Sequence, residues 1–370
     1  MMKKNLLFIC DYAAHYTGTF IASVTLLAEE ARSRGVRVCF LFPAAAKNMK
    51  WVKNLPAEEE DLFWCDFSAL SLLRKCRELS RILNVKDTIV HTHFIADWYL
   101  LAIKSVFRNV VCHYHMMVPM GTSFMKKVKQ QVRRIIYRGV VMIGVSEAVA
   151  EDIRTYFWKP VCRCINNAVD FDSLDRNSEG TELPGVVCDP GKFRILMHGT
   201  DFYGKGVDVA IKAIDELPPQ IRKDVQLFVT SHHTQDAQNM LDSISRGNAV
   251  MTAIRPVENI KKLYDSMSLY ISASREESFG YAVVESAYSD CQVAASNIPG
   301  QNTMKCISDI LWFEMDDVSG LKDVILQAIR RQQDGTAARK KAAQRADAIE
   351  NFRIRDWVRK NMDVYQTYFG

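Results

Sequence analysis

The stretch Arg275 to Glu285 reads R-E-E-S-F-G-Y-A-V-V-E, and it decides how the second half of the chain is interpreted. It follows an apolar run, Leu269–Ile271, that is typical of a buried strand, and it leads into an apolar helical run. A strand, a turn at Gly280 and a helix N-terminus can bind an anion, because several backbone N–H groups point at one place. Two carboxylates, Glu277 and Glu285, flank this turn. The alternative is an ordinary loop between a strand and a helix, with one surface glutamate and one helical glutamate.

The same residues match a known pattern. From Ala273 the chain reads A-S-R-E-E-S-F-G, and E-S-A follows from Glu285. This resembles the Glu-x7-Glu signature of retaining GT-B glycosyltransferases, in particular glycosyltransferase family 4, with Ala273 in place of the usual Pro and Ser278 in place of the first Gly. The resemblance implies that Glu277 orients sugar hydroxyls and that Glu285 holds the ribose of a nucleotide-diphosphate sugar. Eight residues of helix rise span roughly 12 Å, which suits the distance from sugar to ribose.

The composition is that of a globular protein with two domains. The 370 residues are 48% hydrophobic and 25% charged, and a chain of this length usually forms two domains. No apolar run approaches the roughly 18 residues of a membrane-spanning helix, and Leu6–Cys10 is interpreted as a first buried strand. The ten scattered cysteines favour free thiols in a reducing compartment. A net charge of +5 permits anionic substrates or an anionic membrane and does not require nucleic acid.

Short apolar runs alternate with helical periodicity in both halves of the chain. Helices are predicted, for example, at Thr19–Arg34 and Val207–Leu217. The apolar runs predict parallel strands at Leu6–Cys10, Val36–Phe42, Thr88–Val90, Val110–Cys112, Val140–Gly144, Val161–Ile165, Phe193–Met197, Val225–Thr230, Val250–Ala253, Leu269–Ser272 and Val293–Ser296. This alternation predicts an α/β fold with two doubly wound, Rossmann-like domains.

The domain boundaries follow from a polar stretch in the middle of the chain. We expect an N-terminal, acceptor-side domain at 1–171, a linker at 172–191 and a C-terminal, nucleotide-sugar-binding domain at 192–350. The GT-B resemblance implies that the two domains face each other across a cleft. It also implies that a last helix, 351–370, packs back on the N-terminal domain.

A second loop with glycines and a lysine follows the first strand of the C-terminal half. The segment from His198 to Val207 reads H-G-T-D-F-Y-G-K-G-V, and such a loop before a helix can hold a diphosphate. Without the resemblance it is equally an ordinary loop with a solvated lysine. It resembles the family's Gly-Arg-x4-Lys-Gly element, with Gly199, Lys205 and Gly206 in register and Thr200 in place of the arginine. Since that arginine normally helps to stabilise the leaving diphosphate, either another cation replaces it or activity is lower. Arg255 and Arg275 are the candidates.

The N-terminal half offers three further candidates. Gly18 resembles the second residue of the family's Gly-Gly loop, which faces the donor phosphates, and Thr17 replaces the first. The resemblance places His115 near the transferred sugar and His93 on the acceptor side. A core or surface role is the expectation for His91 and His113, the other members of the two His-x-His pairs.

No metal site is expected from the spacing of possible ligands. The histidine pairs lack acidic or cysteine partners at zinc-like spacing. Asp170-Phe171-Asp172 has the form Asp-x-Asp, but its place next to the linker favours a structural role.

The segment 125–138 predicts a basic amphipathic helix. It reads M-K-K-V-K-Q-Q-V-R-R-I-I-Y-R, with an apolar stripe and six basic residues around it. Such a helix can lie on anionic lipid, and a core-packed helix with a solvated basic face is the alternative. Attachment would suit a polyprenyl-linked acceptor.

Together, the residues and the resemblance predict a metal-independent, retaining hexosyltransferase. Its donor is a nucleotide-diphosphate sugar, with a UDP-sugar favoured, and no cofactor is expected. The acceptor is a glycan or a polyprenyl-linked glycan in cell-surface polysaccharide synthesis. We expect a cytoplasmic protein, peripheral on the inner face of the plasma membrane if the basic helix binds lipid. The expected catalytic residues are Glu277, Lys205 and His115; the expected donor-binding residues are Gly18, Gly199, Thr200, Lys205, Glu277, Phe279, Gly280, Tyr281 and Glu285; and His93 is expected on the acceptor side. A GT-B scaffold that has lost turnover and a GT-B sugar-nucleotide epimerase are the alternatives.

Overall fold

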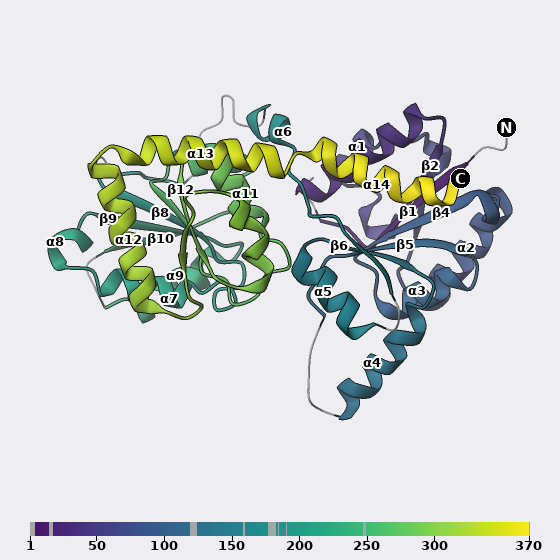
Figure 1. Cartoon of the computed structure of the whole chain (residues 1–370), viewed down its shortest axis with the longest axis horizontal. Helices are drawn as coiled ribbons and strands as arrows, with labels where there is room; N and C mark the ends of the chain where they lie inside the picture. The colour runs from purple at the N-terminus through teal and green to yellow at the C-terminus, as the bar shows by residue number, and fades with distance from the viewer. Residues whose placement is uncertain are drawn as a thin grey trace. The chain divides into compact units, whose positions relative to one another are not determined.

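The computed structural model describes residues 4–14, 18–118, 124–157, 160–176, 183, 185–189, 191–246 and 249–369 (Figure 1). The chain divides into two compact units. Unit 1 comprises Met1–Ala168 and Ile354–Gly370, and unit 2 comprises Val169–Arg353. No helix in the described part of the chain combines the length and apolarity needed to cross a bilayer.

Unit 1 is built on a seven-stranded sheet in which every neighbouring pair is parallel. Its strand order is β3-β2-β1-β4-β5-β6-β7. The strands are β1 (Asn5–Cys10), β2 (Arg37–Pro43), β3 (Leu62–Cys65), β4 (Thr88–His93), β5 (Asn109–Tyr114), β6 (Val141–Gly144) and β7 (Val161–Cys164). Strands β1 and β4 are buried along their whole length and β2 along all but its two end residues, as is usual for parallel strands with apolar sequences.

Helices pack against the sheet of unit 1, and the last helix of the chain is one of them. The helices are α1 (Gly18–Ser33), α2 (Ala69–Ile82), α3 (Asp97–Lys104), α4 (Phe124–Ile136), α5 (Glu147–Tyr156) and α14 (Ile354–Phe369), with short 3-10 turns η1 (Ala44–Ala46), η2 (Lys50–Asn54), η3 (Glu59–Asp61) and η4 (Val85–Asp87). Helix α14 lies beside α1 (Figure 1), and its Trp357 and Tyr365 are buried in the same core as Phe8 of β1.

Unit 2 repeats the pattern with a six-stranded parallel sheet of order β10-β9-β8-β11-β12-β13. The strands are β8 (Phe193–His198), β9 (Val225–Thr230), β10 (Val250–Ile254), β11 (Leu269–Ser272), β12 (Gln292–Ser296) and β13 (Leu311–Phe313). The helices are α6 (Phe171–Arg176), α7 (Val207–Asp215), α8 (Pro219–Arg222), α9 (Thr234–Ile244), α10 (Ile260–Asp265), α11 (Tyr281–Tyr288), η5 (Pro299–Cys306), α12 (Val318–Gln333) and α13 (Thr336–Asn351). The predicted α/β fold with two Rossmann-like domains is confirmed.

All eleven predicted strands exist, and two further strands, β3 and β13, were missed. The predictions Val225–Thr230 and Leu269–Ser272 match β9 and β11 residue for residue. The edge strands β3 and β13 have four and three residues, which is too short to show a period. The start of the expected linker is helical: α6 begins at Phe171, and the Asp170 carboxylate accepts a hydrogen bond from Ser173 N at 3.1 Å. This is the geometry of a helix N-cap.

Both sheets have a point where the strand order reverses. In unit 1 it lies between β1 and β4, and in unit 2 between β8 and β11. Ligands of open parallel sheets bind in the crevice beyond the carboxyl ends of the strands at such a point. The loops that follow these four strands are therefore where a site is expected.

Candidate functional site

The loop after β8 in unit 2 lies directly against the loop after β11. Gly206 has a φ of +65° and forms the N-cap of α7, and a Cβ added there would lie 2.1 Å from Ala273 O. Only glycine fits this close approach. Arg275 N donates a 2.9 Å hydrogen bond to Gly204 O across the same contact. The two segments singled out in the sequence are thus neighbours at the reversal point of the sheet.

Two predicted catalytic residues meet at this contact. Lys205 Nζ forms an ion pair with Glu277 Oε1, and Ser274 Oγ donates to the same oxygen at 3.0 Å. Both side chains are partly exposed, at 32% for Lys205 and 18% for Glu277. The backbone of Glu277 is also held in place, because a Cβ on Gly300 would lie 1.6 Å from Glu277 O. The result is a positioned cation beside a positioned carboxylate.

Helix α11 begins after Glu277, whereas the distance of roughly 12 Å between Glu277 and Glu285 assumed that both residues lie on the helix. Gly280 has a φ of +90° and caps the helix, so the first helical residue is Tyr281. Glu277 therefore lies in the loop, and a span calculated from helix rise over eight residues is wrong. The reason is the left-handed turn at Gly280, which redirects the chain before the helix starts. The backbone N–H groups in the first turn of α11, which begins four residues after Glu277, still offer a place for an anion.

The side chain of Phe279 packs inward and is unavailable to a donor. It is 2% exposed and contacts the rings of Tyr281 and Phe352 at centroid distances of 5.1 and 5.7 Å. The predicted role of Phe279 in donor binding therefore rests on its backbone rather than on its ring. At the neighbouring Gly280, no atom lies closer than 3.7 Å to the place of a Cβ, so the backbone of the turn is not crowded.

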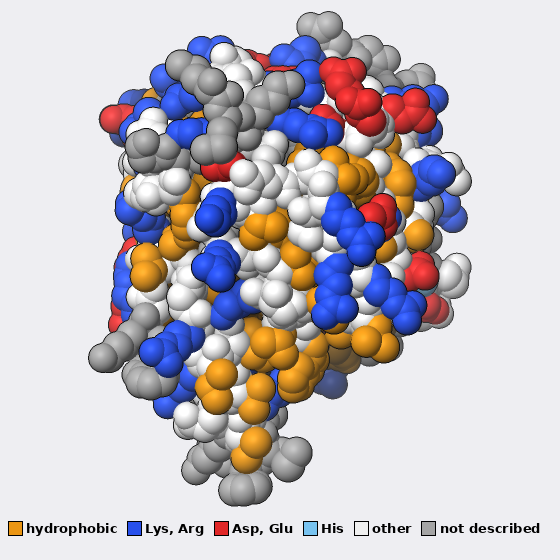
Figure 2. Space-filling view, turned by 90° about the vertical axis from the view of Figure 1, so that its right-hand side faces the viewer, with side chains coloured by type: hydrophobic (Ala, Val, Ile, Leu, Met, Phe, Trp, Pro, Cys, Tyr) orange, Lys and Arg blue, Asp and Glu red, His pale blue; other side chains and the backbone are white. Residues whose placement is uncertain are grey.

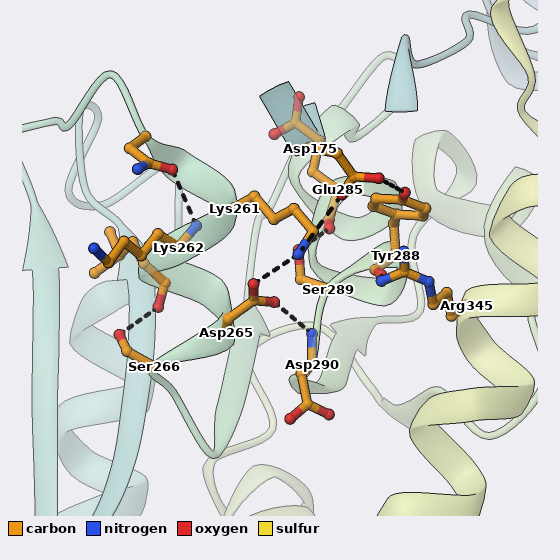
Figure 3. Close-up of polar contacts among 12 residues, drawn as sticks. Asp175, Lys261, Lys262, Asp265, Ser266, Glu285, Tyr288, Ser289, Asp290 and Arg345 are labelled. Atoms are coloured by element: carbon orange, nitrogen blue, oxygen red, sulfur yellow. Dashed lines mark hydrogen bonds and ion pairs between the residues drawn. The ribbon is translucent and has the colours of Figure 1, made fainter. Parts of the chain in front are cut away.

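Glu285 lies one turn into α11, among polar residues from three other helices. Figure 3 shows it beside Lys261 of α10, Asp175 of α6 and Tyr288. Lys261 Nζ contacts Asp265 Oδ2 at 2.7 Å, and Tyr288 Oη donates to Asp175 Oδ2 at 2.6 Å. In the same cluster the Arg345 guanidinium covers the Tyr288 ring at 4.0 Å. Glu285 is therefore held in a dense network of charges.

Tyr270 of β11 connects the two glutamates of the sequence signature. Burial raises the pKa of the Tyr270 phenol, and the charges of Glu277 and Glu285 raise it further. Both carboxylates thus lie close enough to one buried ring to affect its pKa, although three residues of loop and one turn of helix separate them.

His198 at the end of β8 belongs to the same site and had no predicted role. Its ring nitrogens contact Thr230 Oγ1 and Tyr264 Oη, both at 2.8 Å. Burial, together with the nearby charge of Lys205, lowers the pKa of His198 to about 4. The ring is therefore neutral at pH 7. Its place next to Gly199 was the only sequence signal that could have revealed it.

The structure excludes one of the two candidates for a cation that replaces the family's arginine at position 200. Thr200 is exposed in the loop after β8. Arg275 is already engaged, because its guanidinium binds Asp208 through two hydrogen bonds of 2.9 and 3.0 Å and Asp316 through one of 2.7 Å. Arg275 is therefore not a substitute. Arg255 follows β10 and is exposed, so it stays the remaining candidate.

In unit 1, the start of α1 lies against the ends of β4 and β5. Gly18 is the first residue of α1 and is exposed. Two residues on, the Phe20 ring contacts the rings of His93 and His115 at 5.1 and 6.0 Å. The predicted residues of unit 1 are thus brought together at the reversal point of this sheet. Thr17 lies outside the described residues.

His115 is held between two aromatic rings and a second histidine. Phe94 stacks on it at 4.1 Å, and His115 Nε2 contacts His93 Nδ1 at 3.0 Å. Phe94 has a φ of +58°, an unfavourable backbone conformation for a bulky residue that often marks a functional site. Burial lowers the pKa of His115 to about 3. His115 is therefore a neutral, oriented ring at the carboxyl edge of the sheet.

His93 is buried, in contrast to the expected acceptor-side position. It is 1% exposed, and its ring packs against Phe8, His91 and His113. The paired strands β4 and β5 place these side chains on one inward face of the sheet. His93 can support His115, but it does not present a surface to an acceptor.

Helix α4 is only partly what its sequence predicts. Ile136 is buried, whereas Val128 and Ile135 are 41% and 69% exposed. Arg133, expected on the lipid face, forms an ion pair with Asp97 of α3 at 2.7 Å and is 12% exposed. Among the α4 side chains that the structure describes, one predicted basic residue is thus held in an ion pair, and two residues of the apolar stripe are exposed. Figure 2 shows a face of the molecule on which hydrophobic side chains gather next to lysines and arginines.

Comparisons with known proteins place this geometry in context. A family model described as "Glycosyl transferases group 1" matches residues 185–347, and one described as "Glycosyltransferase Family 4" matches residues 22–173. No curated protein sequence matches this chain.

Solved structures match over nearly the full length. A glycosyltransferase from Rickettsia africae is 20% identical with a TM-score of 0.76, covering 100% of this chain and 99% of that one. HepE from Anabaena, in complex with UDP, is 17% identical with a TM-score of 0.73, covering 99% and 100%. Sucrose-phosphate synthase from Thermosynechococcus elongatus is 15% identical with a TM-score of 0.74, covering 99% of each chain. At these identities the likeness establishes the fold.

Proposed function

We propose, from the premise that this chain is a GT-B glycosyltransferase of the family-4 type, that it is a retaining hexosyltransferase with a UDP-sugar as donor. The observation that carries the proposal is the contact between Lys205 and Glu277, made by the two loops at the reversal point of the unit 2 sheet. The UDP complexes of the Anabaena protein support the choice of donor.

The chemistry follows from what each group of unit 2 can stabilise. When a sugar leaves a nucleotide diphosphate, negative charge develops on the β-phosphate. Lys205 and the backbone N–H groups in the first turn of α11 can offset that charge. Glu277, released from Lys205 by the phosphate, is then free to accept hydrogen bonds from sugar hydroxyls. Ser274 keeps the carboxylate in place during this exchange.

The remaining predicted residues take supporting roles in the proposal. Glu285 binds the ribose hydroxyls, and the backbone at Gly199, Thr200 and Gly280 approaches the donor closely. His115 contacts the transferred sugar as a neutral ring. Since lysine and backbone N–H groups supply the positive charge, we propose a reaction that needs neither a metal ion nor a cofactor.

The acceptor is a glycan or a polyprenyl-linked glycan, used in cell-surface polysaccharide synthesis at the inner face of the plasma membrane. What supports a membrane-bound acceptor is the apolar surface of neighbouring helices α3 and α4. Trp98 and Leu101 on α3 are 57% and 48% exposed, and Ile135 on α4 is 69% exposed. Tryptophan and isoleucine side chains beside basic residues suit the interface of an anionic bilayer.

Sedimentation with anionic liposomes tests this surface. We expect the chain to bind at low salt and to be released at high salt, and Ile135→Glu to bind less. Met315→Glu is the matched control, because Met315 is a similarly exposed hydrophobic residue (47%) in unit 2. Absence of binding, or binding that salt does not change, would refute the membrane proposal and leave the transferase proposal intact.

The donor proposal is tested by thermal shift with UDP, GDP, ADP and their sugars, with and without chelator, followed by an assay of nucleotide release. Stabilisation by the UDP compounds alone, unaffected by chelator, together with nucleotide release that Glu277→Ala abolishes, is the expected result. Conversion of the donor sugar without nucleotide release would instead identify an epimerase. Binding without any turnover, for which Thr200 and Ser278 are the arguments, would identify a scaffold that has lost activity.

A further inference from the structure

We propose that three buried histidines of unit 1, His91, His93 and His113, form a binding site for one divalent transition-metal ion of the zinc type. Their candidate ligand atoms all lie within 4.8 Å of one another. This cluster, called the histidine cluster below, is separate from the Lys205–Glu277 contact of unit 2. The proposal does not depend on the transferase function.

The register of the sheet brings the cluster together. His91 and His93 are two positions apart on β4, so both side chains lie on the same face of the sheet. His93 pairs directly with His113 of the neighbouring strand β5. The ring centroids of His91 and His93 are 4.3 Å apart with the rings tilted, and the rings of His93 and His113 stack at 5.0 Å. Two His-x-His segments on adjacent strands thus become one group of ligands.

The cluster holds most of the unpaired buried polar atoms of unit 1. His91 Nε2, His93 Nε2 and both ring nitrogens of His113 are buried without a hydrogen-bond partner. Among the described residues of unit 1, Asn361 Oδ1 is the only other such side-chain atom. Buried polar groups are nearly always paired, so four unpaired nitrogens at one place point to a missing ligand.

The partnered nitrogens show the arrangement that supports metal ligands. His91 Nδ1 contacts Tyr365 Oη at 2.5 Å, and His93 Nδ1 contacts His115 Nε2 at 3.0 Å. A metal-binding histidine usually uses its second ring nitrogen for such a hydrogen bond, which sets the tautomer and the ring orientation. With protons on Nδ1, both Nε2 lone pairs are available to an ion.

The chemistry of the donor atoms selects the class of metal. Imidazole nitrogens suit zinc, copper, nickel and iron, whereas magnesium and calcium prefer oxygen ligands. Three histidines leave the fourth position of a tetrahedral ion open.

The spacing of possible ligands in the sequence had predicted no metal site. The sequence lacks the Cys-x-x-Cys and His-x3–5-His patterns of compact zinc sites, because here His91 and His93 come from β4 and His113 comes from β5. Only the pairing of β4 with β5 makes them neighbours.

The test is the metal content of the full chain, purified without a histidine tag and measured by elemental mass spectrometry. The protein is then stripped of metal with a chelator and titrated with Zn²⁺ and Co²⁺, with Mg²⁺ as the negative control. We expect one equivalent of Zn²⁺ or Co²⁺, a visible spectrum of tetrahedral Co²⁺, and a higher melting temperature with Zn²⁺. No binding of either ion at micromolar concentration would overturn the proposal.

Three variants separate a metal site from a packed core. His113→Phe keeps an aromatic ring against Trp357 and removes two unpaired nitrogens, so the metal-free chain should fold at least as well while affinity falls at least about 100-fold. Tyr365→Phe, which removes only the hydrogen bond to His91, should weaken binding about 10- to 100-fold. His232→Gln is the control, because it changes an exposed histidine outside the cluster. This variant should still bind one equivalent of Zn²⁺ or Co²⁺. A folded His113→Phe variant that binds metal as tightly as the unchanged chain would refute the site.

Discussion

Replacing Lys205 with glutamine tests the proposed chemistry most directly. The change removes a cation whose Nζ contacts Glu277 and keeps the hydrogen bond that Ser274 Oγ donates to that carboxylate. If Lys205 offsets charge on the leaving diphosphate, the loss appears in kcat, because the charge is largest in the transition state.

The magnitude follows from the surroundings of the lysine. Two unit charges 4 Å apart interact by about 4 kcal/mol at an effective dielectric constant near 20, which corresponds to roughly a 10³-fold change in rate. The Lys205 side chain is 32% exposed, so water screens part of this interaction. We therefore expect kcat to fall by about 10²- to 10³-fold.

Stability should change much less than activity. The Lys205–Glu277 pair is partly exposed, and such pairs contribute about 1 kcal/mol or less to the free energy of unfolding. The assay is nucleotide release at saturating donor, combined with urea unfolding of the same samples. Lys212→Gln is the matched control, because this lysine on α7 is 57% exposed and lies 3.9 Å from Asp208. A Lys205→Gln variant that keeps kcat within about threefold, or an equal loss in the control, would refute the reasoning.

Three further predictions concern the same unit and one surface turn. Gly300→Ala should lower the free energy of unfolding by about 3 kcal/mol, since its Cβ would collide with Glu277 O. Gly35 has a φ of +78° but open space around it, so the control Gly35→Ala should lower the free energy of unfolding by only about 1 kcal/mol. Equal losses of stability in urea unfolding would contradict the close approach at Gly300. Because the folded pKa of His198 is about 4 against 6.5 as its ordinary value, the unfolded state takes up the proton first, so stability should be lost as the pH falls from 6.5 to 4, by at most about 3 kcal/mol. Burial also lowers the pKa of His115 in unit 1, so His198→Gln should remove only the His198 contribution to this pH dependence. An unchanged pH profile of unfolding would exclude His198 as a cause. Thr200→Arg should raise kcat/KM by about tenfold or more by restoring a cation beside the diphosphate, and no gain in the nucleotide-release assay would show that another group already supplies it.

The strands and the candidate loops could be predicted because their signals are local. Val225–Thr230 is a continuous apolar run between polar flanks, and it forms β9 over the same residues. The glycines at 206 and 280 marked turns, and both have left-handed backbones that open a helix. Short edge strands such as β13 carry no comparable signal.

The roles of several side chains could not be predicted, because they depend on partners distant in the sequence. Arg275 was a candidate cation for the diphosphate, yet Asp208 and Asp316 already bind it. Phe279 lies in the middle of the signature, but its ring packs against Phe352 from another helix end. Such pairings depend on which elements lie side by side.

The sequence by itself determined the class of the fold, the two-domain division and the two loops that carry Lys205 and Glu277. Hydrophobic periodicity and turn residues act over a few neighbouring positions, so they can be interpreted without a structure. Only the tertiary structure decided that Lys205 and Glu277, 72 positions apart, are in contact, and that His91, His93 and His113 share one buried face. These contacts arise from strand order and register, which are set by the packing of the whole sheet rather than by any local segment.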